Sequence, residues 1–345
     1  MSETATKGGA QPSAKGATAK RPRILSGMRP TGKLHLGNYL GALQNWVRLQ
    51  DLCENFHMVA DWHVLTTDFE HVDGIRQNTF DMVIDWLAAG IDPEKSPMFI
   101  QSRVKEHAEL HLLFSMLTTT ARLERNPTVK EQVRDLNLEG TVSYGHLGYP
   151  VLQAADILLY KANLVPVGED QVPHVELTRE IARRFNSLYG DVFPVPEPKL
   201  THFPRVPGPD GRRMSKSMGN TILLSDSPEE ITAKVRTAYT DPKKIRANDP
   251  GNPDGCVVFA YHRAFNAANA PHIGDLCRAG QLGCVANKKD LSAILVAELT
   301  PFRERRRELE AHPNRIWDVL HHGEERARKI AQETMREVRE AMKLP

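Results

Sequence analysis

Cysteines, long apolar runs and excess charge are all scarce in this chain of 345 residues. Its four cysteines, unevenly spaced, do not suit the disulfide framework of a small secreted protein and fit a reducing cytosol. No apolar run approaches the roughly 20 residues that a membrane-spanning helix needs, so we expect no membrane association. The net charge of +2 is too small to indicate a nucleic-acid partner by itself.

The first 22 residues contain no valine, isoleucine, leucine or aromatic residue. Such a segment cannot bury enough apolar surface to order itself, so residues 1–22 are predicted to form a disordered tail. Like a transit peptide, residues 1–22 contain few acidic and several basic residues. A transit peptide would also carry the large apolar residues of an amphipathic helix, which this segment lacks. We therefore favour disorder over a targeting signal.

Short apolar runs alternate with helix-like segments through the first part of the chain. Strands are predicted at residues 23–27, 56–60, 97–100 and 165–167, and helices at 37–51 and 72–89. Strands that alternate with helices form a doubly wound parallel sheet of the Rossmann type, which we assign to residues 23–227. Ligands bind beyond the carboxyl ends of such strands, so the chemistry is expected in the loops that follow them.

From Pro228 onward the pattern changes to helices without a strand signal. We therefore predict an α/β protein with an all-helical second domain over residues 228–345. The stretch 323–344 places apolar residues from Ala327 to Met342 on one helical face. This final helix region is assigned in part to the sheet domain.

Ser26 to Asn38 links the first predicted strand to a helix. Gly27 and Gly37 lack side chains, so the backbone there can approach a base or a phosphate closely. The helix start would direct free N–H groups at an anion, and His35 and Asn38 could add hydrogen bonds. Taken alone, a histidine before a helix is more often a structural residue.

A second segment, 211–219, is flanked by glycines and carries Arg212, Arg213 and Lys216. A mobile basic loop of this kind could close over a triphosphate. An isolated charge run is usually a solvated loop. The two segments together, in this order, favour phosphate binding instead.

The pair of segments resembles the two signatures of the class I aminoacyl-tRNA synthetases. His35-Leu-Gly-Asn38 is similar to the family's His-Ile-Gly-His, and Arg213-Met-Ser-Lys-Ser217 is similar to its Lys-Met-Ser-Lys-Ser. Arg213 keeps the positive charge of the family's lysine but presents a wider fork.

A predicted helix from Tyr149 to Tyr160 is apolar except for Tyr149, Gln153, Asp156 and Tyr160. At helical spacing these four share one face, where burial would be costly unless they met a ligand or hydrogen-bond partners. Asp156 would be the acceptor that an indole N–H needs in an apolar pocket. A buried carboxylate also needs donors, for which Gln171 or a tyrosine hydroxyl is a candidate.

This helix and the following Val167-Gly-Glu-Asp-Gln171 resemble the tryptophanyl-tRNA synthetases over roughly residue 23 to the C-terminus. Tyrosyl-tRNA synthetase, the nearest alternative, has a related helix but typically a Gly-Ser-Asp-Gln-type segment. For Asp170 at this helix start, simple capping is the structural alternative to a binding role.

The resemblance implies roles for individual residues. The tryptophan set comprises Ser26, Gly27, His63, Tyr149, Gln153, Asp156 and Gln171. The ATP set comprises Met28, Arg29, Gly37, Asn38, Gly168, Asp170, Arg213, Met214, Lys216 and Ser217. The catalytic set comprises Lys216, Arg213, His35, Asn38 and Lys130, with no metal ion held by the protein.

The same resemblance implies that L-tryptophan is ligated to tRNA(Trp) through a tryptophanyl adenylate. ATP and Mg²⁺ would be the cofactors, the protein would be a cytoplasmic homodimer, and residues 228–345 would bind the anticodon. A basic cluster of Arg303, Arg305, Arg306, Arg307, Lys288 and Lys289 could contact tRNA phosphates, although such faces are often only solvated.

Cys256, Cys277 and Cys284 resemble the cysteines that hold an iron–sulfur cluster in some tryptophan enzymes. Asn287 stands where the fourth cysteine would lie, and such clusters usually take four thiolates, so we expect no cluster, with another fourth ligand as the open alternative. His107 and His111 have zinc-like spacing, but without the metalloprotease pattern a partly exposed helix face is favoured.

Two other functions remain as alternatives. A small nucleotidyltransferase could share the first signature but would not need a helical second domain. An auxiliary paralogue that acts on an additional protein partner would fit the unusual tail and the missing cysteine. Both reaction signatures are present, which favours the synthetase.

Overall fold

The computed structural model describes residues 21–200 and 206–345, without the side chain of Ser217. The predicted tail therefore lies almost entirely outside the described residues. The sheet has five parallel strands in the order β3-β2-β1-β4-β5. They are β1 (Arg23–Met28), β2 (Glu54–Val59), β3 (Met98–Ile100), β4 (Leu164–Val167) and β5 (Glu197–Leu200). The predicted parallel sheet is confirmed, and β5 is an additional strand.

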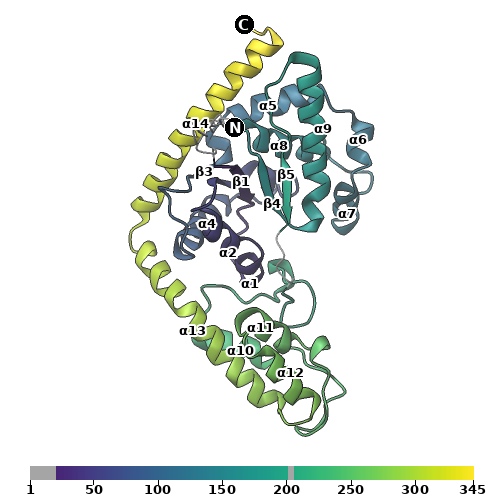
Figure 1. Ribbon diagram of the computed structural model, residues 1–345, viewed down its shortest axis with the longest axis vertical. Helices are drawn as coiled ribbons and strands as arrows, with labels where there is room; N and C mark the ends of the chain where they lie inside the picture. Colours follow the sequence, from purple (N-terminus) through teal and green to yellow (C-terminus); the bar gives the residue numbers. More distant parts are fainter. Residues whose placement is uncertain (1–20, 201–205) are drawn as a thin grey trace, which may run out of the picture.

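Helices cover both faces of the sheet, as Figure 1 shows. Alternate strand residues belong to opposite cores: Met98 and Ile100 of β3 pack with one cluster, and Phe99 between them packs with the other. The first core includes α2 (Gln44–Leu49) and α4 (Ile75–Ala88). The second includes α5 (Glu106–Ser115), α8 (Tyr144–Leu159) and α9 (Val172–Tyr189).

The segment predicted as one helix over 37–51 is interrupted. It consists of α1 (Leu36–Asn38), a π-helical turn η1 (Tyr39–Leu43) and α2. π-Helical turns occur mostly as short insertions, often at functional sites. Gly41 and Ala42 of this turn line the cavity described below.

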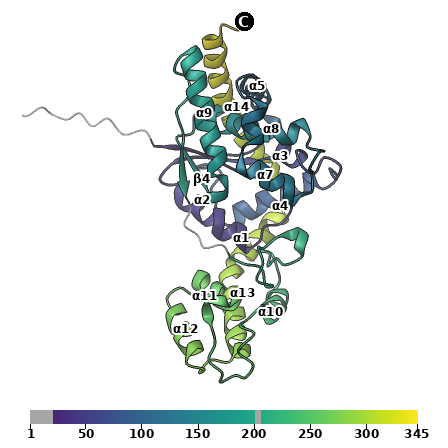
Figure 2. The ribbon, with the colours of Figure 1, turned by 90° about the vertical axis from the view of Figure 1, so that its right-hand side faces the viewer.

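The C-terminal part is helical, as predicted. It contains α10 (Pro228–Arg236), α11 (Val257–Phe265), α12 (Ala270–Arg278), α13 (Cys284–Glu310) and α14 (Pro313–Met342). Figure 2 shows α10, α11 and α12 gathered with the first part of α13 away from the sheet. No helix within the described ranges is long and apolar enough to cross a membrane.

Helix α14 leaves this helical region and lies along β3, an edge strand of the sheet (Figure 1). Its predicted apolar face is buried, with Ala327, Ala331 and Val338 fully inside the sheet domain's second core. Gly323 lies so close to the strand that a Cβ there would sit 1.9 Å from the Met98 carbonyl oxygen. Only glycine allows this approach.

Candidate active site

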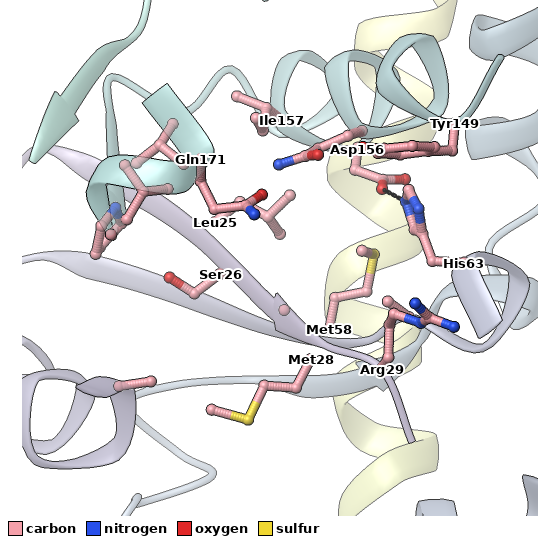
Figure 3. Close-up of a pocket in the computed structure, with 18 of the residues that line it drawn as sticks. Leu25, Ser26, Met28, Arg29, Met58, His63, Tyr149, Asp156, Ile157 and Gln171 are labelled. Carbon is pink, nitrogen blue, oxygen red and sulfur yellow. Dashed lines mark hydrogen bonds and ion pairs between the residues drawn. The ribbon is translucent and has the colours of Figure 1, made fainter. Parts of the chain in front are cut away.

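A cavity of about 340 Å³ opens at the carboxyl end of the sheet, where α/β proteins bind ligands. That volume is within the usual range for small-molecule sites. All of the residues predicted to bind the amino acid line it: Ser26, Gly27, His63, Tyr149, Gln153, Asp156 and Gln171. Figure 3 shows Tyr149, Asp156 and His63 on one side and Ser26 and Gln171 on the other.

Helix α8 provides one wall of the cavity. Ser143 caps its start by accepting a hydrogen bond from the His146 amide at 3.1 Å. Tyr149, Gln153 and Asp156 then follow at helical spacing and line the cavity. Tyr160, the fourth member of the predicted polar stripe, does not line it. Its hydroxyl is buried behind Asp156, bonded to a histidine.

The Asp156 carboxylate is 2% exposed and accepts three hydrogen bonds. His63 Nε2 donates to Oδ2 at 2.8 Å, while Gln101 Nε2 at 2.8 Å and His107 Nδ1 at 2.7 Å donate to Oδ1. Burial alone would raise the pKa of Asp156, but the bonds from His107 and His63 outweigh it and hold the pKa well below its usual range. The carboxylate is therefore ionised inside an apolar wall.

These donors differ from those suggested by the sequence. Neither Gln171 nor a tyrosine hydroxyl bonds Asp156, and Gln171 Nε2 donates instead to Asp170 at 3.0 Å. The interpretation of His107 as part of an exposed face was wrong, since its side chain is 0% exposed. His107 Nε2 lies 2.9 Å from the Tyr160 hydroxyl, which fixes its orientation.

Tyr149 is held at the cavity by a second histidine. Its hydroxyl lies 2.9 Å from His174 Nε2. Burial and the nearby His63 together lower the pKa of His174 to about 4, so the ring is neutral at physiological pH. Burial also raises the pKa of Tyr149. The pair therefore presents a fixed, uncharged hydroxyl.

The opposite wall comes from the end of β1. The Ser26 hydroxyl oxygen is buried without a hydrogen-bond partner among the described residues, although Ser26 lines the cavity. At Gly27 a Cβ would meet the Met58 carbonyl oxygen at 3.0 Å, so a side chain there would crowd the strand. Leu25, Trp46, Met58, Ile157 and Val165 supply apolar lining.

The two signature segments come together next to this cavity. His35 accepts a bond from the Gly37 amide at 3.1 Å and Asn38 accepts one from the His35 amide at 3.1 Å, which caps α1. Lys216 Nζ donates to the Thr31 carbonyl at 2.9 Å. The two segments are therefore in direct contact.

Their electrostatics follow from this proximity. Burial, together with the charges of Lys216 and Arg213, lowers the pKa of His35 to about 4. Burial also lowers the pKa of Lys216 to about 8, against the opposing influence of Asp85 and Asp81. His35 is thus neutral, and Lys216 titrates near physiological pH.

Only some of the residues predicted to bind ATP line the cavity. Met28, Arg29 and Gly168 line the cavity, and Arg29 donates to the Thr67 hydroxyl. Met214 is 6% exposed in the first core, so only its backbone is available to a nucleotide. Asp170 is exposed and makes no helix-capping bond, which removes the simple capping alternative.

Lys130 lies on α7 (Pro127–Asp135) and is exposed, two residues before the cavity residue Gln132. The Thr128 hydroxyl donates to the Asp170 carbonyl at 3.0 Å. This bond ties α7 to the segment after β4.

Comparison with known proteins decides the family. Residues 17–300 match the model of class I tRNA synthetases for W and Y. Tryptophan–tRNA ligases of Thermotoga maritima and Aquifex aeolicus are 52% and 47% identical, covering 93% and 94% of this chain and 99% and 100% of those proteins. The chain belongs to the tryptophanyl-tRNA synthetases.

Solved structures agree with this family. A tryptophanyl-tRNA synthetase from Campylobacter jejuni, complexed with ADP and tryptophan, superposes with a TM-score of 0.82 at 35% identity, covering 93% of this chain and all of that one. A tyrosyl-tRNA synthetase from Archaeoglobus fulgidus, at 22% identity and a TM-score of 0.66, shares the fold.

The iron–sulfur cysteines of some tryptophanyl-tRNA synthetases have three counterparts here. Burial raises the pKa of the Cys256 thiol. The Cys284 and Cys277 thiols are close enough to raise the same pKa as well. Asn287 is 9% exposed and hydrogen-bonds His262 instead. Three thiols and an amide do not match the four thiolates that such a cluster takes.

Only some of the basic side chains on α13 are available to contact tRNA phosphates. Arg306 is 3% exposed, so the prediction that it contacts tRNA phosphates was wrong. Arg305 donates to the Ala88 carbonyl at 2.6 Å and Lys288 to the Arg236 carbonyl at 3.0 Å. Arg307 and Lys289 are exposed.

Proposed function

We propose that the chain activates L-tryptophan with ATP and then transfers it to tRNA(Trp). The observation that carries this proposal is the ionised Asp156 in the wall of a partly apolar cavity. An ionised carboxylate offers about four acceptor sites, and the bonds from His63, Gln101 and His107 leave one on Oδ2. Indole has one N–H donor on a large apolar ring, which suits that vacancy.

The polar groups on the other sides of the cavity suit the amino-acid head group. The Tyr149 hydroxyl keeps a lone pair beyond its bond to His174, and Gln171 keeps its carbonyl oxygen while its amide bonds Asp170. Both can accept hydrogen bonds from an ammonium group. The buried, unbonded Ser26 hydroxyl suits the tryptophan carboxylate.

In the proposed activation step the tryptophan carboxylate attacks the α-phosphorus of ATP in line, and the bond to pyrophosphate breaks. Lys216 and Arg213 meet the phosphates as negative charge grows on pyrophosphate, with Lys130 of α7 as a further positive charge. Neutral His35 offers a hydrogen bond rather than a charge. The backbone at Gly37 and Gly168, with Met28, Arg29, Asn38 and Asp170, would contact the nucleotide.

Mg²⁺ would enter with ATP and neutralise its phosphates. The described residues include no group of three or more His, Cys, Asp or Glu side chains placed to hold a metal ion. We propose that Mg²⁺ is bound chiefly through the substrate phosphates, which is its usual mode in such sites. The protein then acts mainly by positioning substrates and stabilising charge.

The second step brings tRNA(Trp), whose terminal ribose attacks the adenylate and releases AMP. The helices from α10 to α13 would bind the anticodon region, with Arg307 and Lys289 available to phosphates. A homodimer would use the exposed apolar residues Leu112 of α5, Met116 directly after it and Tyr144 of the adjoining α8. A cytoplasmic location fits translation and the four unpaired cysteines.

Exchange of labelled pyrophosphate into ATP tests the activation step. We expect exchange that depends on tryptophan and Mg²⁺ and is absent with tyrosine. Exchange with tyrosine alone would overturn the substrate assignment. Exchange with neither amino acid would favour an auxiliary protein that has kept the fold without the reaction.

A further inference from the structure

A buried ion pair joins α13 to α4 outside the cavity. The Arg306 side chain is 3% exposed and the Asp85 side chain is 0% exposed, and Nη1 of the arginine donates to Asp85 Oδ1. Nη2 of Arg306 also reaches Asp81 at 2.6 Å and Glu310 at 2.9 Å. Burying charges like these is costly, so the arrangement calls for a reason.

The second oxygen of Asp85 provides one. Asp85 Oδ2 accepts a hydrogen bond from the backbone N–H of Leu34 at 2.7 Å. Leu34 directly precedes His35, and its carbonyl accepts a bond from the Leu224 amide at 2.9 Å. The Leu36 amide donates to the Ile222 carbonyl at 3.0 Å. The first signature and the segment after the second signature are therefore paired at the point that Asp85 anchors.

We propose that Asp85 is a positioning residue for the activation reaction. Its carboxylate, held between Arg306 and the Leu34 amide, fixes the backbone at Leu34 and so places His35 relative to Lys216. Because α10 and α11 pack on α13, the same pair links the proposed anticodon-binding helices to the phosphate site. This inference rests on the proposed function for its kinetic consequence.

A purely structural role would not require this carboxylate. Leu299 and Phe302 of α13 already pack in the first core with residues of α4. Buried ion pairs can often be replaced by apolar side chains of similar size without loss of stability. The Leu34 N–H needs a hydrogen-bond acceptor at position 85, which an apolar side chain cannot provide. Removing this acceptor while keeping an apolar side chain of similar size therefore separates the positioning role from the packing role.

Two double variants test the proposal. Arg306→Met with Asp85→Leu removes the charges and the acceptor. Arg306→Met with Asp85→Asn removes the charges but keeps an oxygen that can accept from Leu34. Arg326→Met is the matched control, because Arg326 also joins a C-terminal helix to the sheet domain, through the Pro93 carbonyl at 3.0 Å, without touching either signature.

Thermal unfolding first establishes the folded fraction of each variant. In pyrophosphate exchange the Leu double variant should lose about a hundredfold in kcat, the scale expected from small misplacement of reacting groups. Its KM for tryptophan should stay unchanged, because the tryptophan residues lie on other elements. The Asn double variant should recover most of the lost rate, and the control should match the unsubstituted protein.

Equal exchange rates in the two double variants, in proportion to folded fraction, would overturn the proposal. Hydrogen–deuterium exchange gives a second readout that needs no activity: amides at 34–36 should lose protection in the Leu variant and keep it in the Asn variant. Absence of exchange in the unsubstituted protein would count against the proposed function alone. If the Leu double variant does not fold, the Asn double variant decides alone: a kcat close to that of the unsubstituted protein is expected, and a loss of about a hundredfold at full folded fraction would overturn the proposal.

Discussion

The hydrogen bond proposed between Asp156 and the indole N–H can be tested from both partners. Asp156→Ala removes the acceptor, and β-(3-benzothienyl)alanine replaces the indole N–H with sulfur. A hydrogen bond to a charged group contributes about 1.5–3 kcal/mol, which corresponds to a roughly ten- to hundredfold preference. The unsubstituted protein should therefore prefer tryptophan to the sulfur analogue by about that factor in kcat/KM.

Asp156→Ala should abolish most of this preference while leaving the KM for ATP unchanged. Pyrophosphate exchange with each amino acid measures both quantities. The comparison is independent of any loss of stability from leaving His63, Gln101 and His107 without their acceptor, since both substrates meet the same folded protein. A preference that survives in Asp156→Ala would refute the assigned contact.

Two further predictions concern pH and packing. The pKa of Lys216 is lowered to about 8 before phosphates bind, so its ammonium loses its charge as pH rises through that value. The KM for ATP should therefore rise above about pH 8, and Lys216→Arg should flatten this pH profile. An unchanged pH profile in Lys216→Arg would assign the titration to another group. Gly323→Ala should lower the free energy of unfolding in urea by about 1–3 kcal/mol or more, because its Cβ would meet the Met98 carbonyl oxygen. Gly145→Ala, whose nearest contact is an ordinary 3.9 Å, is the control and should be neutral or stabilising.

Local spacing predicted much of the site. The polar face of α8 and the two signature segments are each short and continuous in the sequence. Over such distances residue spacing decides which side chains share a face. The strands that were predicted are largely apolar, and β2 and β3 are almost entirely buried. β5 was missed because it is largely exposed and contains Glu197, Pro198 and Lys199, which are not typical strand residues.

The groups that support Asp156 could not be found in this way. His63, Gln101 and His107 lie 93, 55 and 49 residues from it in the sequence. Their convergence depends on the strand order, which places the ends of β2 and β3 beside α8. The prediction that Arg306 contacts tRNA failed for a related reason. Its acidic partners lie on α4, far away in the sequence, and meet Arg306 only when α4 and α13 pack together.

Transfer of labelled tryptophan to tRNA(Trp) tests the central claim most directly. The purified protein, ATP, Mg²⁺ and an unmodified tRNA(Trp) transcript are sufficient, with a tRNA(Tyr) transcript and labelled tyrosine as controls. We expect tryptophan to become acid-precipitable with tRNA(Trp) only, and only when ATP is present. Tyrosine attached to tRNA(Tyr), or no product from a preparation active in pyrophosphate exchange, would contradict the proposed charging of tRNA(Trp).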